Sequence, residues 1–349
     1  MIKHPIMQKG DLCLVTGITG YLASWIGKHL IEEGFQVRGT VRKLSNVNQI
    51  EKMNELLPGV ELVEANLLSE EGWKEPAEGC KWVFHVASPQ FNVKVDLVET
   101  ATKGTQHVMN AAFQSGTVRK IVITSSEAAM VFGHPASKLT FSEDDWTNPN
   151  GIADYYRSKT IAEKLAWDLV KDQTRNPRGV ELSSINPCII FGPSLLPGVR
   201  FSVENVKNIA EGKMPMLPDM VLHFVDVRDC ARMHICIMNS PNTNGNRYLS
   251  FSAKGSFSDI ASVIHDNYSD LGFAPSKKVM PKFFMWPLKF FNKEVASVYP
   301  RIGKDIAYTS KYPNVYQYKY TAFSDIICDT MDYLVDNKLI KPKSGNNRI

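Results

Sequence analysis

The sequence has few cysteines, and their spacing suits neither a metal site nor a pair of neighbouring redox thiols. Six cysteines occur among 349 residues. None of them forms a Cys-x-x-Cys pair, and none joins histidines at the spacing of zinc ligands. We therefore expect reduced thiols in the core of a protein that binds no metal and resides in the cytoplasm.

Long apolar runs are also absent. The first apolar run, residues 12–15, is far shorter than the ~7–15 apolar residues of a secretion signal. No stretch approaches the ~18 uninterrupted apolar residues of a membrane span. The most amphipathic segment, residues 283–291, is interrupted by Pro287 and Lys289. We expect a core or pocket-lining helix there rather than a membrane anchor.

An excess of charge of one sign is missing as well. The chain carries 40 lysines and arginines against 36 aspartates and glutamates, so its formal charge is only +4. A nucleic-acid-binding protein usually shows a clustered basic stripe, and the sequence has no such stripe. We expect a monomer or homodimer that acts on a small molecule and has neither a nucleic-acid nor a membrane partner.

What the sequence does contain is an alternation of predicted strands and helices. Short apolar runs predict strands at residues 12–16, 36–41, 60–64, 82–86, 121–124 and 182–186. The segments between them predict helices at residues 21–33, 48–57, 97–115 and 156–171. This alternation predicts an α/β fold with a Rossmann-type, doubly wound parallel sheet covered by helices on both faces.

The alternation loosens after residue 187, where prolines, loops and shorter helices become frequent. We therefore expect residues 1–187 to form the sheet domain. Residues 188–349 are expected to form mostly a smaller C-terminal substrate-binding lobe over the carboxyl edge of the sheet, with some segments returning to the core.

A glycine-containing turn, residues 16–23, joins the first predicted strand to the first predicted helix. Gly17 permits a tight turn, Gly20 lets the backbone approach a pyrophosphate, and Ala23 is small enough for close packing of helix on strand. Phosphates would then lie at the helix N-terminus, where free N–H groups and the helix dipole favour anions. Strand, turn and helix together predict a dinucleotide site rather than a merely structural turn.

The residues after the second predicted strand indicate which dinucleotide binds. An NAD site usually carries an acidic residue ~20 residues after the turn, but residues 34–50 contain no Asp or Glu. The strand end instead carries Arg38, Arg42 and Lys43. A guanidinium can bind a 2′-phosphate through two hydrogen bonds, so we expect NADPH, with Arg42 as the main ligand. The alternative is a solvated, basic strand end.

Tyr155 and Lys159 lie four residues apart at the start of a predicted helix, and hence on one helical face. A free tyrosine has a pKa of ~10, and a neighbouring ammonium group favours the phenolate and lowers that pKa. The pair follows a strand that ends in Ser125 and Ser126. Tyr156 has no such partner, because the residue four positions later is Thr160.

Taken in order, these motifs resemble the extended short-chain dehydrogenase/reductase superfamily. Within it the chain looks most like the dihydroflavonol-reductase-like group, which also contains cinnamoyl-CoA reductases and microbial aldehyde and ketone reductases. The resemblance covers most of the chain. It rests on residues 16–23, 37–42, 84–89, 122–126, 155–159, 185–193 and 224–229.

The resemblance implies a Ser–Tyr–Lys catalytic site formed by Ser126, Tyr155 and Lys159. Tyr155 would protonate the carbonyl oxygen as hydride arrives from nicotinamide, Lys159 would hold the nicotinamide ribose, and Ser126 would hydrogen-bond the same oxygen. The family motif places this serine at position 126 rather than 125. The residues expected to contact NADPH or NADP⁺ are Gly17, Ile18, Thr19, Gly20, Tyr21, Leu22, Arg42, Lys43, Asn66, Leu67, Ala87, Tyr155, Lys159, Pro187 and Ile190.

Two positions depart from the group's pattern. Asn66 stands where the family commonly has an Asp that contacts adenine, and an amide can still bind the adenine edge. Glu127 follows Ser126, where small residues are more usual, and the sequence does not decide between a solvated carboxylate and one that shapes substrate choice. We expect the substrate pocket to be lined by Phe91, Met130, Phe132 and Phe191.

We therefore expect an NADPH-dependent reductase of an aldehyde or ketone. A sugar-nucleotide epimerase/dehydratase or a hydroxysteroid dehydrogenase of the same superfamily is an alternative. Arg200, Lys207 and Lys213 are the candidates for the diphosphate clamp that a sugar nucleotide would need. A second alternative, of another class, is a protein that senses NADP(H) by binding it without turnover.

Overall fold

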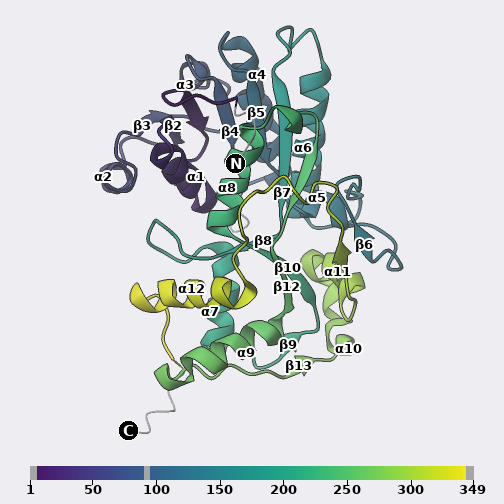
Figure 1. The fold of residues 1–349 in the computed structure, drawn as a ribbon. Coiled ribbons are helices and arrows are strands. Elements are labelled where there is room, and N and C mark those ends of the chain that lie inside the picture. The colour runs from purple at the N-terminus through teal and green to yellow at the C-terminus, as the bar shows by residue number, and fades with distance from the viewer. Residues whose placement is uncertain (1–5, 90–94, 343–349) are drawn as a thin grey trace.

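The structure is a computed structural model that describes residues 6–89 and 95–342. Its largest element is a parallel sheet of seven strands in the order β11-β7-β5-β4-β1-β2-β3 (Figure 1). The strands are β1 (Leu12–Val15), β2 (Gln36–Val41), β3 (Glu61–Glu64), β4 (Trp82–His85), β5 (Lys120–Thr124), β7 (Glu181–Pro187) and β11 (Arg247–Ser250). The strand order reverses between β1 and β4, and doubly wound sheets bind ligands in the crevice outside such a point.

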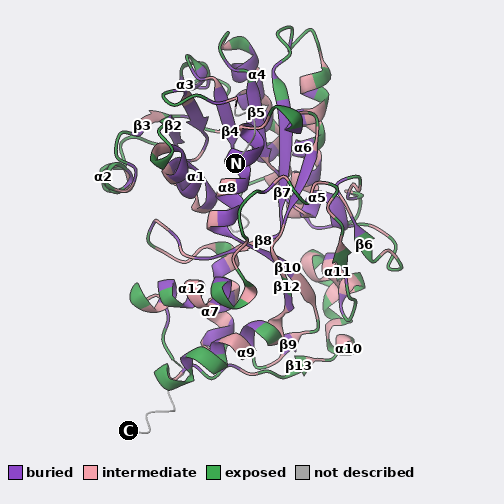
Figure 2. Cartoon of the chain, in the orientation of Figure 1, coloured by how far each residue is buried: buried purple, intermediate pink, exposed green. Residues whose placement is uncertain are grey.

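Helices cover both faces of this sheet. One face carries α1 (Tyr21–Glu32), α2 (Val47–Leu56) and α8 (Val227–Met238). The other face carries α3 (Lys74–Ala77), α4 (Leu97–Gln114) and α6 (Asp154–Lys171). The central strands are buried between these layers (Figure 2), which is why β4 and β5 are short, mostly apolar runs without alternation.

A second lobe lies beyond the carboxyl edge of the sheet. It contains a three-stranded sheet of β8 (Ile189–Phe191), β10 (Val221–Asp226) and β12 (Ala253–Ser256), and the helices α7 (Phe201–Ala210), α9 (Phe257–Tyr268) and α12 (Phe323–Asp336). Ser256 begins α9 with a capping box, in which its side chain and that of Asp259 bind each other's backbone N–H groups.

Shorter elements link the two lobes along one side. The small two-stranded sheets pair β6 (Thr140–Phe141) with β14 (Ala307–Tyr308), and β9 (Leu217–Pro218) with β13 (Val279–Met280). The short helices are α5 (Ala128–Val131), α10 (Lys282–Met285), α11 (Lys293–Val298), η1 (Pro241–Thr243), η2 (Ser269–Leu271), η3 (Leu288–Phe290) and η4 (Tyr299–Arg301).

The chain returns to the large sheet after entering the second lobe. Helix α8 packs against α1, and β11 extends the sheet beside β7. The buried Lys120 of β5 fixes this return, because its ammonium group donates to the carbonyl of Ile237 at 2.6 Å and to Oγ1 of Thr243 at 2.7 Å. The end of α8 and η1 are thereby attached to the centre of the sheet.

The predicted α/β Rossmann-type fold is confirmed. Strand β2 occupies the predicted residues 36–41, and the other predicted strands and helices agree to within one or two residues at their ends. Helix α6 begins at Asp154, two residues earlier than predicted, with an acidic side chain in the first turn as the helix dipole favours.

The prediction for residues 283–291 is wrong. The segment forms no core or pocket-lining helix: α10 ends at Met285, η3 follows, and six large apolar side chains of the segment are exposed. An amphipathic pattern shows that one face of a segment is apolar. It does not show whether another helix or strand of the same chain packs on that face. Among the described residues, no helix combines the length and the apolar character needed to cross a bilayer.

Candidate active site

The glycine turn between β1 and α1 lies against the loop after β4. Gly17 has φ +66°, and a Cβ atom there would lie 3.1 Å from Cβ and 3.3 Å from Cα of Ala87. Only glycine meets both the left-handed backbone and the close approach. A Cβ atom at Gly20 would lie 3.0 Å from the carbonyl oxygen of Gly17. The turn therefore brings backbone close to the switch point of the sheet.

The N–H groups of this turn divide into two sets. Those of Gly17 and Ile18 donate to Oγ1 and the carbonyl of Thr40, and the Ile18 side chain is completely buried. Helix α1 begins after Gly20 without a side-chain cap. The first-turn N–H groups of Tyr21 and Leu22 have no acceptor in the described part of the chain. This uncapped terminus fits a pyrophosphate.

A buried hydroxyl fixes the loop that carries Ala87. Oγ1 of Thr16 accepts the N–H groups of Val86 at 3.0 Å and Ala87 at 2.9 Å, and lies 3.0 Å from Nδ1 of His85. Because this oxygen already accepts two N–H groups, its own proton is directed at Nδ1. Burial, together with the positive charge of Lys159, lowers the pKa of His85 to about 3. His85 is therefore a neutral structural residue at physiological pH.

The basic residues at the end of β2 have two different roles. Arg38 is held by the protein: its Nε lies 2.8 Å from a carboxylate oxygen of Glu61, and its Nη1 donates to the carbonyl of Glu78 at 2.7 Å. Arg42 and Lys43 are exposed beyond the strand, and neither forms an ion pair within residues 6–89 and 95–342. These two cations are available to an anionic group.

The loop after β3 places Asn66 beside the start of α3 and Leu67 beside the middle of α4. Oδ1 of Asn66 accepts the N–H of Leu68 at 3.1 Å, so its amide nitrogen is the group available to a ligand. Leu67 packs against α4, where a Cβ atom at Gly104 would lie 2.6 Å from it. Asn66 is exposed and Leu67 is half-buried.

The structure brings Ser126 and Tyr155 together. Their side chains are hydrogen-bonded, whereas the hydroxyl of Ser125 points away and donates to Glu163 at 2.6 Å. Burial raises the pKa of Tyr155, the carboxylates of Glu127 and Glu294 raise it further, and the Ser126 hydrogen bond lowers it. The sequence predicts a lowered pKa from the neighbouring ammonium group. In the free protein, burial outweighs every stabilisation of the phenolate.

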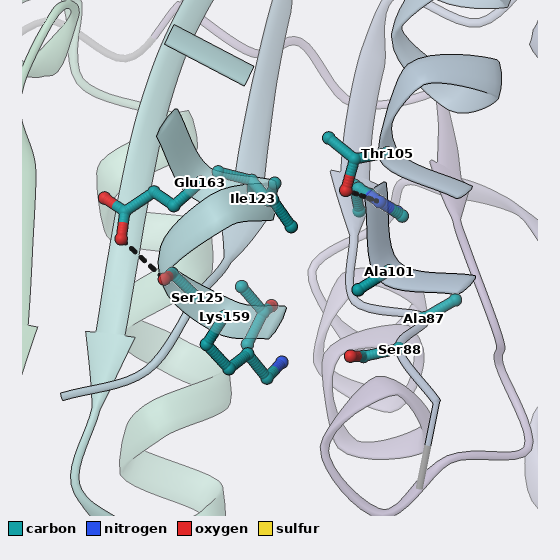
Figure 3. Close-up of a pocket in the computed structure, with 11 residues that line it drawn as sticks. Ala87, Ser88, Ala101, Thr105, Ile123, Ser125, Lys159 and Glu163 are labelled. Carbon is teal, nitrogen blue, oxygen red and sulfur yellow. Dashed lines mark hydrogen bonds between the residues drawn. The ribbon is translucent and has the colours of Figure 1, made fainter. Parts of the chain in front are cut away.

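Lys159 lies one helical turn after Tyr155 on α6. Its side chain points toward Ala87 and Ser88 across a small pocket (Figure 3). Burial lowers the pKa of Lys159 to about 8, and the carboxylate of Glu163 opposes this shift. The spacing of four residues puts Tyr155 and Lys159 on one face of α6, and Lys159 reaches the pocket that Ala87 lines.

A buried ion pair behind the site was not predicted. Both carboxylate oxygens of Glu163 accept from Arg247, with Oε1 2.7 Å from Nε. Its remaining hydrogen bonds come from Ser125, Trp167, Ser184 and Asn186. Asn186 also donates to the carbonyl of Ser126 at 3.0 Å. Because Glu163 follows Lys159 by one turn, this network fixes α6 and the strand end that carries the serines. Its members are far apart in sequence, so no local pattern indicates it.

Glu127 belongs to a second, half-buried cluster between α5 and β14. It accepts a short hydrogen bond from the hydroxyl of Tyr308, and that hydroxyl in turn accepts from Nη2 of Arg301 at 3.3 Å. The Arg301 guanidinium lies 5.1 Å above the ring of Phe132. Glu127 is therefore not a solvated outlier but a partner of the second lobe beside Ser126.

The predicted pocket residues differ in their exposure and in their contacts. Met130 and Phe191 are 0% and 1% exposed and pack inside hydrophobic clusters, so they present no surface to a substrate. Phe132 stacks on Tyr156 with ring centroids 3.8 Å apart. Phe91 lies outside the described residues. The prediction is corrected for Met130 and Phe191, because apolar side chains next to a pocket equally well form its supporting core.

The remaining predicted cofactor residues lie where the two lobes meet. Pro187 ends β7 and its carbonyl accepts the N–H of Glu127 at 2.9 Å. Ile190 is half-buried in β8, and Thr19 is half-buried in the glycine turn. The hydroxyl of Tyr21 donates to the carbonyl of Gly192 at 2.6 Å, which links the start of α1 to the loop after β8.

The candidates for a diphosphate clamp are already engaged by the protein. Nε of Arg200 donates to Oγ of Ser194 at 3.1 Å. The ammonium groups of Lys207 and Lys213 lie 2.5 and 2.6 Å from the carboxylate of Glu211. Within the described ranges, no group of His, Cys, Asp and Glu side chains is arranged to hold a metal ion.

Comparison with known proteins agrees with this architecture. The model of the NAD dependent epimerase/dehydratase family matches residues 13–249. Cinnamoyl-CoA reductase CAD2 of Medicago truncatula is 30% identical over 300 residues, which cover 82% of this chain and 89% of that protein. Cinnamoyl-CoA reductase 1 of Petunia hybrida is 31% identical over 296 residues, which cover 82% of this chain and 86% of that protein.

The fold is also similar to that of solved structures. Yeast methylglyoxal/isovaleraldehyde reductase Gre2, complexed with NADPH, superimposes with a TM-score of 0.76 at 22% identity, over 94% of this chain and 100% of that chain. The resemblance to extended short-chain dehydrogenase/reductases of the dihydroflavonol-reductase-like group is confirmed. The uncapped start of α1, the parallel strand order and the matched length thus lead to one assignment: the chain belongs to the NAD dependent epimerase/dehydratase family.

Proposed function

We propose that this protein uses NADPH to reduce the carbonyl group of a small aldehyde or ketone, with Tyr155 as the proton donor. One observation carries the proposal. The hydrogen-bonded side chains of Ser126 and Tyr155, with Lys159 one turn further along α6, lie at the carboxyl edge of the sheet beside the turn that approaches Ala87.

The chemistry balances with these groups alone. When bound, reduced nicotinamide supplies the hydride that forms the new C–H bond. Tyr155 gives its phenolic proton to the carbonyl oxygen, and Ser126 donates a hydrogen bond to the same oxygen as negative charge develops there. The products are an alcohol and NADP⁺, and solvent returns a proton to Tyr155.

The electrostatics of Tyr155 keep its phenol in the protonated form. Burial and the carboxylates of Glu127 and Glu294 raise the pKa of its phenol. The neutral phenol therefore predominates at physiological pH, and this is the form that can donate a proton. Oxidation of an alcohol would require the phenolate, which the same surroundings disfavour.

Two features support NADPH as the dinucleotide. The uncapped N-terminus of α1 offers free N–H groups to a pyrophosphate, and the exposed Arg42 and Lys43 offer cations to a 2′-phosphate. The amide nitrogen of Asn66 can donate to the adenine ring. No aspartate or glutamate within residues 34–50 opposes a phosphate there.

The nature of the substrate follows from what the site holds and lacks. Arg200, Lys207 and Lys213 are occupied by protein partners, which speaks against a sugar nucleotide. Phe132 and Tyr156 form a stacked aromatic pair near Ser126, which favours an aryl or alkyl carbonyl compound. Relatives named for reduction of cinnamoyl-CoA, methylglyoxal or isovaleraldehyde support the same class. A cytoplasmic location is part of the proposal, because all six cysteines are free thiols.

The decisive experiment measures NADPH oxidation with a panel of aryl and alkyl aldehydes and ketones. We expect Tyr155→Phe to lower kcat by ~10²–10⁴-fold with NADPH binding nearly unchanged, because only the acid is removed. Tyr156→Phe is the matched control. Tyr156 stacks on Phe132 and hydrogen-bonds Glu294, so this variant should retain most of the activity.

Four results would contradict the proposal. Equal loss in both variants would point to a structural effect. Retained turnover in Tyr155→Phe would assign the proton to another group. NADPH binding without oxidation by any carbonyl compound would indicate a sensor that holds the dinucleotide without turnover, and activity only on sugar nucleotides with NAD would indicate an epimerase or dehydratase.

A further inference from the structure

Residues 283–291 form an exposed apolar surface that the proposed function does not use. We call Phe283, Phe284, Trp286, Leu288, Phe290 and Phe291, which are 67, 54, 53, 50, 62 and 90% exposed, the aromatic patch. Large aromatic side chains carry ~150–250 Å² each, so the patch exposes on the order of 600 Å² of apolar surface. That is the upper end of the ~300–600 Å² found for the largest patches on monomeric proteins.

The patch is an ordered structure rather than a set of scattered side chains. The rings of Phe283 and Phe284 lie 4.2 Å apart, and Trp286 meets Phe290 edge to face at 5.1 Å. Short helices α10 and η3 present these side chains at the rim of the second lobe, at the lower right of Figure 1. Helices this short have no hydrophobic core of their own that would require six large apolar residues.

The segment that carries the patch is rich in lysine and ends beside Glu294. Residues 276–293 contain Lys277, Lys278, Lys282, Lys289 and Lys293, and no aspartate or glutamate. The ammonium of Lys289 lies above the rings of Trp286 and Phe290, 5.6 and 5.0 Å from their centroids. Lys277 lies 3.6 Å from Asp266, the one ion pair of these lysines among the described residues.

We propose that the aromatic patch docks on the surface of an anionic lipid bilayer. Tryptophan and phenylalanine rings would enter the boundary between headgroups and acyl chains, and the lysines would lie at the level of the phosphates. Each lysine near an anionic surface adds to the attraction, and the aromatic rings add the apolar contribution. The protein would lie on the membrane without crossing it.

Charge complementarity favours a lipid surface over the two other possible occupants of the patch, a second copy of this chain and a different protein. In a two-fold dimer the same patch faces itself, so five lysines would oppose five lysines. Protein–protein interfaces are depleted in lysine and enriched in arginine, whereas lysine next to tryptophan and phenylalanine is typical of membrane surfaces. The basic residues of the segment 276–293, which carries the patch, are all lysines.

The test is co-sedimentation of the full chain with vesicles of phosphatidylcholine alone or with 30% phosphatidylserine. We expect at least tenfold stronger partitioning onto the anionic vesicles. Phe283→Ser/Phe291→Ser should reduce it at least tenfold. Lys278→Gln/Lys293→Gln should reduce it by roughly fivefold per lysine. Leu139→Ser/Leu271→Ser is the matched control, because these leucines are exposed outside the patch, and should partition like the parent protein.

Light scattering without lipid accompanies the measurement. A parent dimer that Phe283→Ser/Phe291→Ser converts to a monomer would make the patch a dimer interface and overturn the proposal. Equal partitioning onto both kinds of vesicle, or equal loss in the leucine control, would overturn it as well, as would binding to an acidic protein but to neither vesicle. The experiment needs neither cofactor nor substrate, so its result is independent of the proposed reductase activity.

Discussion

Arg42 is the residue whose replacement most directly tests the dinucleotide preference. It lies exposed just after β2, and no carboxylate of the described residues pairs with it. Arg42→Ala removes one guanidinium and leaves the sheet untouched, because Arg38 makes the structural contacts of the strand, with Glu61 and with the carbonyl of Glu78. The variant should therefore fold like the parent protein and differ only toward a ligand with a 2′-phosphate.

The expected magnitude follows from the exposure of the group. A hydrogen bond to a charged partner contributes ~1.5–3 kcal/mol, and solvent screening at an exposed site favours the lower end. Lys43 remains beside the phosphate and limits the loss further. A loss of ~1.5–2 kcal/mol corresponds to roughly a 10–30-fold rise in the KM for NADPH, since ~1.4 kcal/mol is a factor of ten. NADH lacks the phosphate, so its KM should stay within about twofold of the parent value.

The assay compares initial rates with NADPH and NADH at one saturating aldehyde concentration. Lys52→Ala is the control. It also removes one exposed positive charge, but from within α2 rather than from the end of β2. Screening predicts that the Arg42→Ala effect shrinks in high salt. Equal rises in both KM values, or an equal effect of Lys52→Ala, would refute the role of Arg42 as the 2′-phosphate ligand.

Two further predictions concern α6. Because the pKa of Lys159 is about 8, kcat/KM for carbonyl reduction should fall as pH rises above 8 and the amine loses its proton, a limb that a pH–rate profile of the free enzyme reports. Glu163→Gln should move that limb to lower pH, because the carboxylate favours the charged form of the Lys159 amine. It should also lower the free energy of unfolding by ~3–5 kcal/mol, because Arg247 stays buried without its charge partner. Glu99→Gln, at an exposed ion pair with Lys103, should leave both the limb and the melting temperature unchanged; a limb that stays in place in Glu163→Gln would refute the coupling.

Features built from neighbouring residues could be predicted from the sequence. The strands of the large sheet are short apolar runs, and the glycine turn and the Tyr155–Lys159 spacing are local patterns whose meaning depends on one strand and one helix. Burial between two helical layers makes such runs apolar along their whole length, which is why β4 and β5 were recognisable. The paired glycines likewise reflect a steric requirement visible at Gly17.

Features built from distant residues could not. Glu163 and Arg247 meet because β11 lies beside β7, and Glu127 meets Tyr308 because β14 pairs with β6. Neither pairing leaves a periodic signal. The pKa of Tyr155 is also a property of the assembled site, since burial, the hydroxyl of Ser126 and the carboxylates of Glu127 and Glu294 determine it. Residue type alone did not distinguish the buried Phe191 from the exposed Phe291.

The completion of the large sheet by β11 has a consequence for biosynthesis. The ribosome releases the glycine turn and the Ser–Tyr–Lys residues well before β11 emerges from the exit tunnel. Until then, β7 has one edge of unsatisfied backbone groups. A nascent chain at this stage exposes unpaired backbone groups and apolar surface, to which chaperones bind. The large sheet is therefore complete only after residues of both lobes have been synthesised.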